Sequence, residues 1–262
     1  MLVFVGMGIR GEESLTLEGL REIREADEVY AELYTSPLPQ LDLQKLEGMA
    51  GRKISLLGRK EIEEGQELLE ISTRKKVVLL VPGDPMIATT HVSLRLAAAS
   101  RGIPTKVVHS SSIVSAAAGL TGLQSYKFGR SATVPLPDLK SIHPYEVLGE
   151  NTERGLHTLL FLDVRCESGT YLSAPQAIQI LLQLEEQERR GYFTGQRLVV
   201  VIARAGADNC VVRGDRAANL LKQDFGPVPH VLVVPGRLHF LEARALEVFA
   251  GVPEDVVREL EG

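Results

Sequence analysis

The chain of 262 residues is long enough to bury a full hydrophobic core, as one large domain or two modest ones. Its 44% hydrophobic and 24% charged residues are typical of a folded globular protein and exclude a disordered one. The formal net charge of −5 argues against a dedicated nucleic-acid binder, because such proteins carry a basic surplus against phosphates.

The N-terminal stretch MLVFVGMG is apolar, but it has no basic segment and glycines interrupt it. We expect the first strand here rather than a signal peptide or a membrane span, and no later apolar run approaches the ~18 residues of a spanning helix. The two cysteines, Cys166 and Cys210, are too few for a disulfide framework or a four-ligand metal site. We therefore expect a cytoplasmic protein without a metal and without direct contact to membranes or nucleic acid.

In the first half of the chain, short apolar strands alternate with amphipathic helices. The predicted strands cover residues 2–5, 28–33, 53–57, 77–81 and 105–109. The predicted helices lie around residues 15–26, 59–74 and 88–100. This alternation is typical of crossover units on a mostly parallel sheet.

The same pattern resumes after the glycine-punctuated residues 119–124. Strands are predicted at residues 131–136, 157–164, 197–203 and 230–236, with helices near residues 144–154, 174–190, 214–224 and 238–250. The third of these helices would start after Gly214 and Asp215. We therefore expect two α/β domains with mostly parallel sheets, an N-terminal one over residues 1–115 and a C-terminal one over residues 116–262.

The first strand ends in Gly6, Gly8 and Gly11, which have the spacing of a dinucleotide fingerprint. Glu12 and Glu13 follow at once, however, and two carboxylates would repel a pyrophosphate. The glycines either form a tight turn without a ligand or let the backbone approach a ligand that is neutral or positively charged.

The fourth strand runs into the turn Pro82-Gly83-Asp84-Pro85. Asp84 before Pro85 is a good helix start, with the carboxylate as N-cap and proline at the first helical position. Alternatively, the turn presents Asp84 and the backbone of residues 86–87 to a ligand, because open α/β sheets bind ligands outside the carboxyl ends of their strands.

The fifth strand ends in HSSSIVSAAAGLTG, residues 109–122. Its serines are suited to cap the next helix, and its small residues allow either close core packing or a close approach to a ligand. Each of His91, His109, His157 and His230 is more often structural than catalytic in such contexts. Neither a metal-binding histidine spacing nor a Gly-x-Ser-x-Gly elbow or Walker loop occurs.

Taken in order, several motifs resemble the diphthine synthase family, within the tetrapyrrole-methylase-like methyltransferases that use S-adenosylmethionine. The matching segments are GMG (6–8), AELYTS (31–36), PGDP (82–85), ATTH (88–91), HSSSI (109–113), YKFGRSATV (126–134), RGLHTLLFLDV (154–164), ARAG (203–206) and VPGRLH (235–239). The resemblance covers nearly the whole chain.

The resemblance implies a two-domain α/β homodimer that binds S-adenosylmethionine in a cleft between its domains. Carried over position by position, the family's cofactor contacts fall on Ile9, Asp84, Ile87, Ser112, Ile113, Leu162, Ala205 and His230. All of them lie at or near a predicted strand end except His230, which opens the last strand.

The resemblance further implies methylation of the amino group of the 3-amino-3-carboxypropyl arm of a modified histidine on translation elongation factor 2, a step of diphthamide formation, with S-adenosylhomocysteine as the other product. Glu32, Tyr34 and His91 are candidates for a proton acceptor, and none is assigned as catalytic. The number of methyl groups and the residues that hold the protein substrate stay open. The alternatives are a related methyltransferase acting on a tetrapyrrole-type molecule, a non-catalytic adenosine-ligand sensor, and a nicotinamide-dependent oxidoreductase that rests on the glycine spacing.

Overall fold

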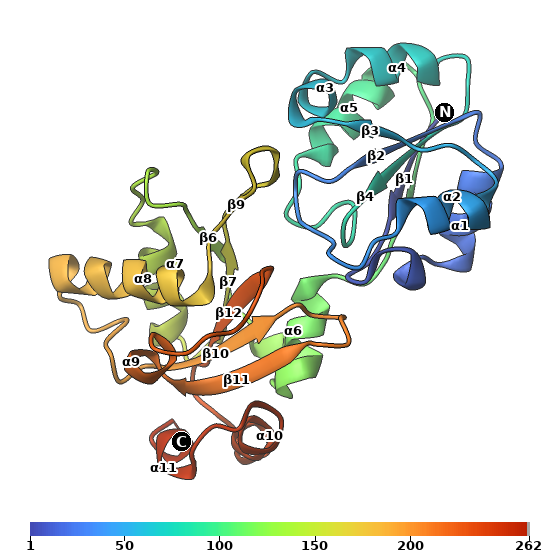
Figure 1. Ribbon diagram of the computed structural model, residues 1–262. Helices are drawn as coiled ribbons and strands as arrows, with labels where there is room; N and C mark the ends of the chain where they lie inside the picture. The colour runs from blue at the N-terminus through green and yellow to red at the C-terminus, as the bar shows by residue number, and fades with distance from the viewer. Residues whose placement is uncertain (261–262) are drawn as a thin grey trace. The chain divides into compact units, whose positions relative to one another are not determined.

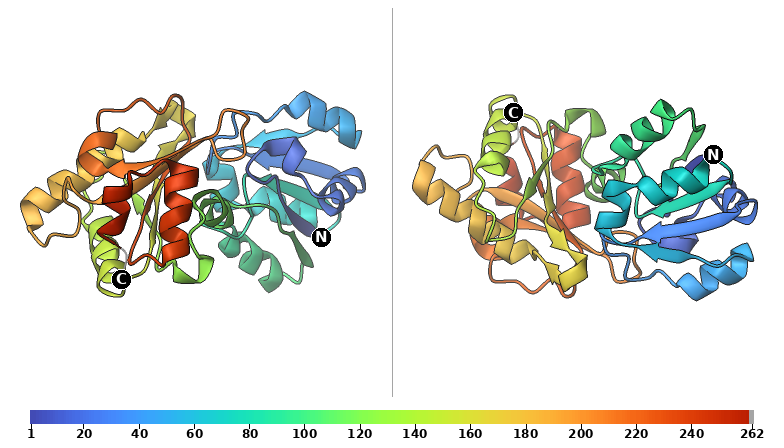
Figure 2. Two further views of the ribbon diagram at one scale, coloured as in Figure 1. Left: turned by 90° about the horizontal axis from the view of Figure 1, so that it is seen from below. Right: turned by 90° about the horizontal axis from the view of Figure 1, so that it is seen from above.

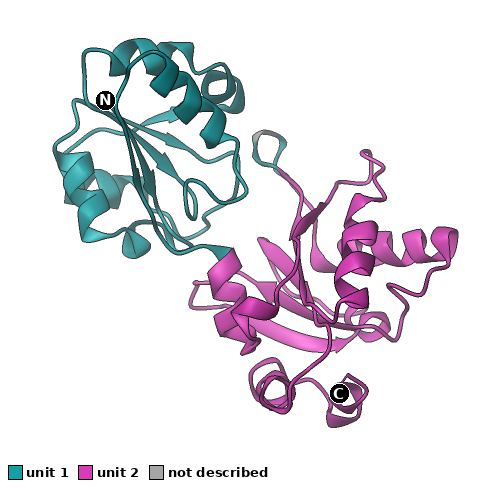
Figure 3. Ribbon diagram, turned by 180° about the vertical axis from the view of Figure 1, so that it is seen from behind, with its two compact units in different colours: residues 1–113, 165–169 teal, residues 114–164, 170–262 magenta. Residues whose placement is uncertain are grey.

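A computed structural model describes residues 1–260 and divides the chain into two compact units (Figure 3). Unit 1 comprises Met1–Ile113 and Arg165–Gly169, and unit 2 comprises Val114–Val164 and Thr170–Gly262. The division falls at the start of helix α6 (Ile113–Thr121). Within residues 1–260, the helices are all too short or too polar to cross a membrane.

Unit 1 contains a five-stranded parallel sheet in the order β3-β2-β4-β1-β5 (Figure 1). Its strands are β1 (Leu2–Gly6), β2 (Glu28–Glu32), β3 (Ser55–Leu57), β4 (Val77–Val81) and β5 (Thr105–Val108). The two central strands, β1 and β4, are buried at every position, as parallel strands covered on both faces are. All five strands predicted from the first half of the sequence are confirmed.

Helices cover both faces of this sheet (Figure 2), and they create two separate cores. They are α1 (Leu17–Arg24), α2 (Leu43–Ala50), α3 (Arg59–Glu64), α4 (Gln66–Ser72) and α5 (His91–Ser100). Because side chains alternate along a strand, Phe4 of β1 packs in the core with Leu68 and Leu94, whereas Val5 packs in the other core.

Two helix predictions in unit 1 need correction. The helix expected over residues 59–74 is broken at Gly65, whose φ of 61° lies in the left-handed region and ends α3. A Cβ at Gly65 would lie 2.5 Å from Leu94 Cδ1, so a larger residue would have to displace that side chain as well as adopt a positive φ. The helix expected from residue 88 begins at His91 instead, with Thr90 as its N-cap.

The sheet of unit 2 is mixed, whereas we expected a mostly parallel one. Its order is β11-β10-β12-β7-β6, and only β6 (Ala132–Val134) and β7 (Thr158–Leu162) pair in parallel. The strands β10 (Leu198–Ala203), β11 (Val211–Arg216) and β12 (His230–Val234) run antiparallel to their neighbours. The predicted helix at residues 214–224 is thereby replaced by the end of β11 and the short α9 (Ala217–Leu220).

Around this sheet lie α7 (His143–Glu153), α8 (Ala174–Glu188), α10 (Phe240–Ala250) and α11 (Glu254–Arg258). The ribbon β8 (Val164–Arg165) and β9 (Thr170–Tyr171) stands apart from the sheet. Ser173 is the N-cap of α8. It forms a capping box with Gln176, whose side chain accepts from the Ser173 backbone N–H at 2.9 Å.

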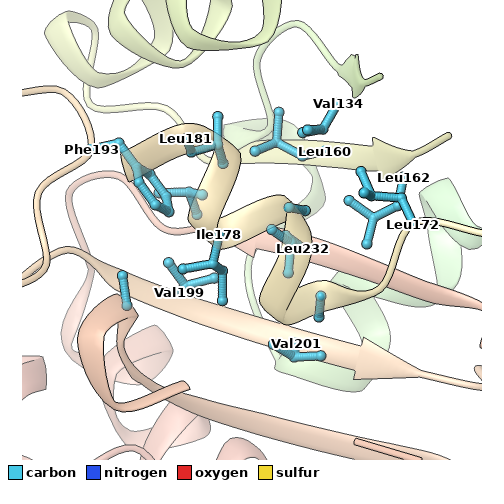
Figure 4. Close-up of a cluster of buried hydrophobic side chains, with 14 of the residues drawn as sticks. Val134, Leu160, Leu162, Leu172, Ile178, Leu181, Phe193, Val199, Val201 and Leu232 are labelled. Atoms are coloured by element: carbon cyan, nitrogen blue, oxygen red, sulfur yellow. The ribbon is translucent and has the colours of Figure 1, made fainter. Parts of the chain in front are cut away.

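The core of unit 2 lies between α8 and the sheet (Figure 4). Ile178 and Leu181 of α8 pack with Leu160, Val199 and Leu232 of the strands, and all five side chains are buried. Each fully buried aliphatic side chain of this kind contributes about 1.5–3 kcal/mol.

A buried polar network in unit 2 joins residues from three of the segments that resemble the diphthine synthase family. Glu242 of α10 accepts a hydrogen bond from His157 Nε2 at 2.9 Å and forms an ion pair with Lys127. The backbone N–H groups of Gln124 and His239 donate to the same carboxylate at 2.9 Å each. Burial raises the pKa of Glu242, but the Lys127 contact and these N–H donors outweigh it and lower the pKa to about 2. The network therefore holds three distant segments together, and His157 is structural.

Candidate functional site

The loops that follow β1, β4 and β5 meet at the carboxyl edge of the unit 1 sheet. These strands are neighbours in the order β4-β1-β5, so their ends lie side by side. Gly8 and Gly83 exchange two backbone hydrogen bonds, N–H to oxygen, at 3.1 and 2.9 Å. The backbone N–H of Ile9 donates to Ser111 Oγ at 3.3 Å. Hydrogen bonds therefore join all three loops into one surface.

Glycine is required where these loops touch. A Cβ on Gly6 would lie 2.6 Å from the Gly83 carbonyl oxygen and 2.8 Å from Ser110 Cβ. A Cβ on Gly8, which has a φ of 66°, would lie 2.6 Å from Ser111 Oγ. The glycine spacing thus serves the close packing of the three loops.

The third position of the apparent fingerprint lacks the structure that a pyrophosphate needs. Gly11 begins a short 3-10 helix, η1 (Gly11–Ser14), and not an α-helix. Glu12 is buried at 5% exposure, where it accepts from the Asp42 N–H at 3.1 Å and pairs with Lys45 at 3.1 Å. A buried carboxylate in the helix-like turn is incompatible with phosphate binding, so the oxidoreductase alternative loses its support.

Asp84 organises the turn after β4. Its Oδ1 accepts from the Met86 N–H at 3.0 Å, while its Oδ2 accepts from the Ser110 N–H at 3.3 Å and lies 2.8 Å from His109 Nδ1. Because α5 begins only at His91, the helix-start interpretation of Asp84 and Pro85 is wrong. The carboxylate instead ties the turn after β4 to the loop after β5.

Five of the eight predicted cofactor contacts, Ile9, Asp84, Ile87, Ser112 and Ile113, belong to these loops of unit 1. Ile87 is an apolar side chain at 42% exposure, and Asp84 and Ser112 are 7% and 8% exposed. The edge therefore combines an exposed aliphatic group with backbone polar groups and one fixed carboxylate. This is the mixture that recognises a small ligand with an apolar body and a few polar atoms.

The other three predicted contacts lie at one edge of the unit 2 sheet. Leu162 ends β7, Ala205 follows β10, and His230 begins β12. Since β12 runs antiparallel to both neighbours, its first residue pairs with Ala203 at the end of β10 and precedes Val231, the partner of Phe161. Because β12 runs antiparallel to β10 and β7, His230 at its start lies at the same sheet edge as the ends of those two strands.

The ring of His230 is held by the protein itself. The Ala174 N–H donates to its Nδ1 at 3.1 Å, and its Nε2 lies 3.2 Å from the Pro227 carbonyl oxygen, to which it donates. Burial lowers the pKa of His230, so the neutral ring with a proton on Nε2 is favoured. Both ring nitrogens are occupied, and a ligand contact from His230 would come from its backbone or its ring carbons.

Sequence reasoning missed the role of Arg204, which precedes Ala205. Its guanidinium donates to the carbonyl oxygens of Phe225 and Pro227 at 2.6 Å each, and to that of Asn209 at 3.1 Å. Arg204 is buried and has a φ of 53°, an uncommon conformation for a residue with a side chain. It fixes the loops before β11 and β12 at the edge that carries Ala205 and His230.

The family model described as Tetrapyrrole (Corrin/Porphyrin) Methylases matches residues 1–220. The chain belongs to the tetrapyrrole methylase family. It is 45% identical over 268 residues to the diphthine synthase of Methanosarcina barkeri, with all of both chains covered. It is also 45% identical to the diphthine synthase of Methanothermobacter thermautotrophicus, with 99% of each chain covered. A solved structure described as a crystal structure of diphthine synthase superposes with a TM-score of 0.90 at 40% identity, covering 98% of each chain. The expected family is thus confirmed.

Methylases of this family use S-adenosylmethionine, and the loops of unit 1 fit such a group. Ile87 supplies an exposed apolar contact, and the Asp84 carboxylate lies in the same turn. Within residues 1–260, no group of three or more His, Cys, Asp or Glu side chains is arranged to hold a metal ion.

The three candidate proton acceptors lie in unit 1 and are buried. Glu32 and His91 have no exposed surface, and Tyr34 is 5% exposed. Burial, followed by the charge of Glu32, raises the pKa of Tyr34 to about 12, so its hydroxyl keeps its proton at neutral pH. None of the three is placed to touch an acceptor amine at the surface of the unit.

Proposed function

We propose that the protein transfers methyl groups from S-adenosylmethionine to the amino group of the 3-amino-3-carboxypropyl-histidine of translation elongation factor 2, giving diphthine. The observation that carries this is the 45% identity to diphthine synthases over the full length of both chains. We place the reaction in the cytoplasm, because translation factors act there.

The donor is proposed to contact residues from both of the sheet edges described above. The loops after β1, β4 and β5 would hold the donor with Ile9, Asp84, Ile87, Ser112 and Ile113. The edge of unit 2 would add Leu162, Ala205 and His230. What supports this assignment is that the residues of each unit gather at a single sheet edge.

S-adenosylmethionine supplies an electrophilic methyl group on a sulfonium. The amine would use its lone pair to accept this methyl group, and the sulfur would leave with the electrons of the carbon–sulfur bond. The work of the protein is to align the two reactants, which can lower the barrier by ~7–11 kcal/mol. An α-amino group with a pKa near ~8 is partly neutral at pH 7, so a strong base is not required. Rigid loops such as the Gly8–Gly83 pair provide the alignment.

We also propose that the protein is a homodimer and that α10 contributes to the contact. Four large apolar side chains of this helix, Phe240, Leu241, Val248 and Phe249, are 56–66% exposed. Apolar side chains grouped in this way mark interaction surfaces. A second copy of the chain is the occupant we propose, because a homodimer is what the resemblance implies.

Transfer of label tests the function directly. The protein is incubated with methyl-labelled S-adenosylmethionine and with elongation factor 2 that carries the unmethylated 3-amino-3-carboxypropyl-histidine. We expect label on that residue, located by peptide mass spectrometry. Binding of the donor without transfer would favour an adenosine-ligand sensor, and transfer to a tetrapyrrole but not to the factor would favour the other branch of the family.

A further inference from the structure

One polar side chain at the edge of unit 1 has no part in donor binding as described so far. His109 is the first residue of the HSSSI segment and directly follows β5. Its side chain is 71% exposed. The predicted cofactor contacts include Ser112 and Ile113 of the same segment but not His109. The residue therefore lies beside the proposed donor site without an assigned role.

The Nδ1 atom of this ring is fixed by a carboxylate. His109 Nδ1 lies 2.8 Å from Asp84 Oδ2. An ionised carboxylate only accepts hydrogen bonds, so Nδ1 donates and carries the proton of the neutral ring. The same carboxylate accepts from the backbone N–H groups of Met86 and Ser110 at 3.0 and 3.3 Å. The backbone of two loops thus holds the group that sets the tautomer and the orientation of the imidazole.

The Nε2 atom of the same ring is left to accept a proton. In this tautomer Nε2 carries a lone pair and no hydrogen. Among residues 1–260, Nε2 of His109 has no hydrogen-bond partner, and the ring is mostly exposed. Imidazole is the side chain that most readily takes up and releases a proton near neutral pH. A molecule bound at this edge can therefore reach a proton acceptor of suitable strength.

The arrangement of His109 differs from that of the other histidines. Three of them are buried, with 8% exposure or less: His91, His157 and His230. His143 and His239 are exposed, but within residues 1–260 no carboxylate pairs with either ring. A carboxylate, an oriented imidazole and an exposed lone pair in sequence are what a histidine needs to act in proton transfer. His109 combines all three.

The other charged groups near this loop are engaged with partners of their own. The loop adjoins η1, because Ser110 Oγ donates to the Ser14 carbonyl oxygen at 3.1 Å. The charged side chains in or next to η1, on α5 and on β5 have these contacts: Arg10 with Glu13 at 2.6 Å, Glu12 with Lys45 at 3.1 Å, Arg95 with Thr105 Oγ1 at 3.3 Å and Lys106 with Glu22 at 2.8 Å. Asp84 is the charged partner of the His109 ring.

Methyl transfer to an amine creates a need for such an acceptor. When the amine takes the methyl group, its nitrogen becomes positively charged and keeps its hydrogens. The nitrogen regains a lone pair only when one N–H bond breaks, and a further methyl transfer to the same atom requires that lone pair. The buried side chains Glu32, Tyr34 and His91 are not placed to accept this proton.

We propose that His109 is a catalytic proton acceptor: its Nε2 takes a proton from the methylated amine, while Asp84 orients the ring through Nδ1. The N–H bond of the ammonium breaks and leaves its electron pair on nitrogen, Nε2 binds the proton with its own lone pair, and the exposed imidazolium releases the proton to water. The role rests on the proposed function, because the amine has to come within hydrogen-bond reach of Nε2.

Nuclear magnetic resonance of the ligand-free protein tests the state of the ring without any substrate. In a long-range nitrogen–proton correlation spectrum at mildly alkaline pH, His109 is assigned by its loss in His109→Gln. We expect a protonated Nδ1 and an Nε2 with the signature of a bare lone pair. A neutral ring with its proton mainly on Nε2 would overturn the proposal, because that nitrogen could not accept another.

His109→Gln separates proton transfer from the link between the two loops. The glutamine amide can still donate to Asp84, but it does not take up a proton near neutral pH. We expect S-adenosylmethionine affinity within about threefold of wild type by calorimetry. The rate of label transfer to elongation factor 2, with both substrates saturating, should fall on the order of 100-fold. A wild-type rate in this variant would refute the catalytic role and leave His109 as a structural link.

His109→Ala allows the missing base to be replaced from solution, because the ring occupies an exposed position. Added imidazole should raise the transfer rate of His109→Ala at least roughly tenfold and leave wild type unchanged. No acceleration of His109→Ala would contradict the proposal. The matched control is His143→Ala, at an exposed histidine without a carboxylate partner, which should keep the affinity and the rate of wild type.

Failure of the proposed function gives a different result from failure of this inference. If wild type transfers no label to the factor, the proposed function fails, while the resonance experiment still decides the tautomer of His109. If wild type is active and His109→Gln is equally active, only the role of His109 is refuted.

Discussion

Glu242 allows a quantitative prediction of how stability depends on pH. Its pKa is about 2 in the folded protein, against 4.5 for the same group in the unfolded chain. Each unit of difference is worth about 1.4 kcal/mol, so the ionised carboxylate stabilises the fold by about 3 kcal/mol at pH 7. The folded pKa is the lower one, so this stabilisation is complete above about pH 4.5 and is lost as the pH falls toward about 2.

The perturbation is Glu242→Gln, which resembles the protonated side chain in shape. We expect the free energy of unfolding, measured by urea titration, to fall by about 3 kcal/mol at pH 7 relative to wild type. At pH 3 the difference should shrink to about 1 kcal/mol, because wild type has lost most of its advantage there. The control is Glu247→Gln on the same helix, where a surface pair with Arg244 is worth at most about 1 kcal/mol. A difference between wild type and Glu242→Gln that stays constant from pH 7 to pH 3 would refute the reasoning.

Three further predictions concern the site and its surroundings. Asp84→Ala removes the acceptor of the Met86 and Ser110 N–H groups, and we expect S-adenosylmethionine affinity to fall at least roughly tenfold by calorimetry. The control is Asp42→Ala, which removes the N-cap of α2. It should lower the free energy of unfolding by about 1 kcal/mol and leave S-adenosylmethionine affinity unchanged. An equal loss of affinity in Asp84→Ala and Asp42→Ala would argue against the site. Ala88 has a φ of 55°, in the left-handed region that residues with a side chain rarely adopt. Ala88→Gly should raise the free energy of unfolding by about 1 kcal/mol, and Ala97→Gly inside α5 should lower it by a similar amount; a loss at both positions would mean that Ala88 is not strained. Leu241→Glu should convert the proposed dimer to a monomer in light scattering, whereas Leu17→Glu, at a position 88% exposed in α1, should not. A dimer in both variants would place the contact elsewhere.

The architecture of unit 1 follows from its sequence to a large extent. A parallel sheet covered on both faces needs unbroken apolar strands, and Val77–Val81 is such a run: it is short, rich in β-branched valine and followed by Pro82. Local signals were weaker guides to helix ends. A glycine at position 65 is compatible with a helix interior as well as with a left-handed C-cap, and the sequence alone does not distinguish the two.

Unit 2 shows what strand composition leaves undetermined. Val199–Val201 and Val231–Val233 are buried on both faces, as parallel strands are, yet the two strands pair antiparallel. Direction depends on the connections between strands, and the sequence predicts a helix after Gly214 and Asp215 where the structure has the end of β11. This single error also left the position of His230 unexplained.

In the candidate site, too, the sequence indicates local features, whereas contacts between segments distant in sequence come only from the fold. The resemblance points to residues that the structure places at or next to strand ends. The helix-cap interpretation of Asp84 is wrong, because its carboxylate accepts from Ser110, in a loop distant in sequence, as well as from Met86. The His109–Asp84 and Arg204 contacts join segments that are distant in sequence. Side-chain partners of this kind become visible only when the fold brings the segments together.

Diffraction from crystals grown with S-adenosylhomocysteine tests the central claim most directly. We predict density for the ligand against the loops after β1, β4 and β5, in contact with Ile9, Asp84 and Ser112. We also predict contacts to Leu162, Ala205 and the backbone of His230. Ligand density bound elsewhere on the chain, or none at saturating concentration, would contradict the account.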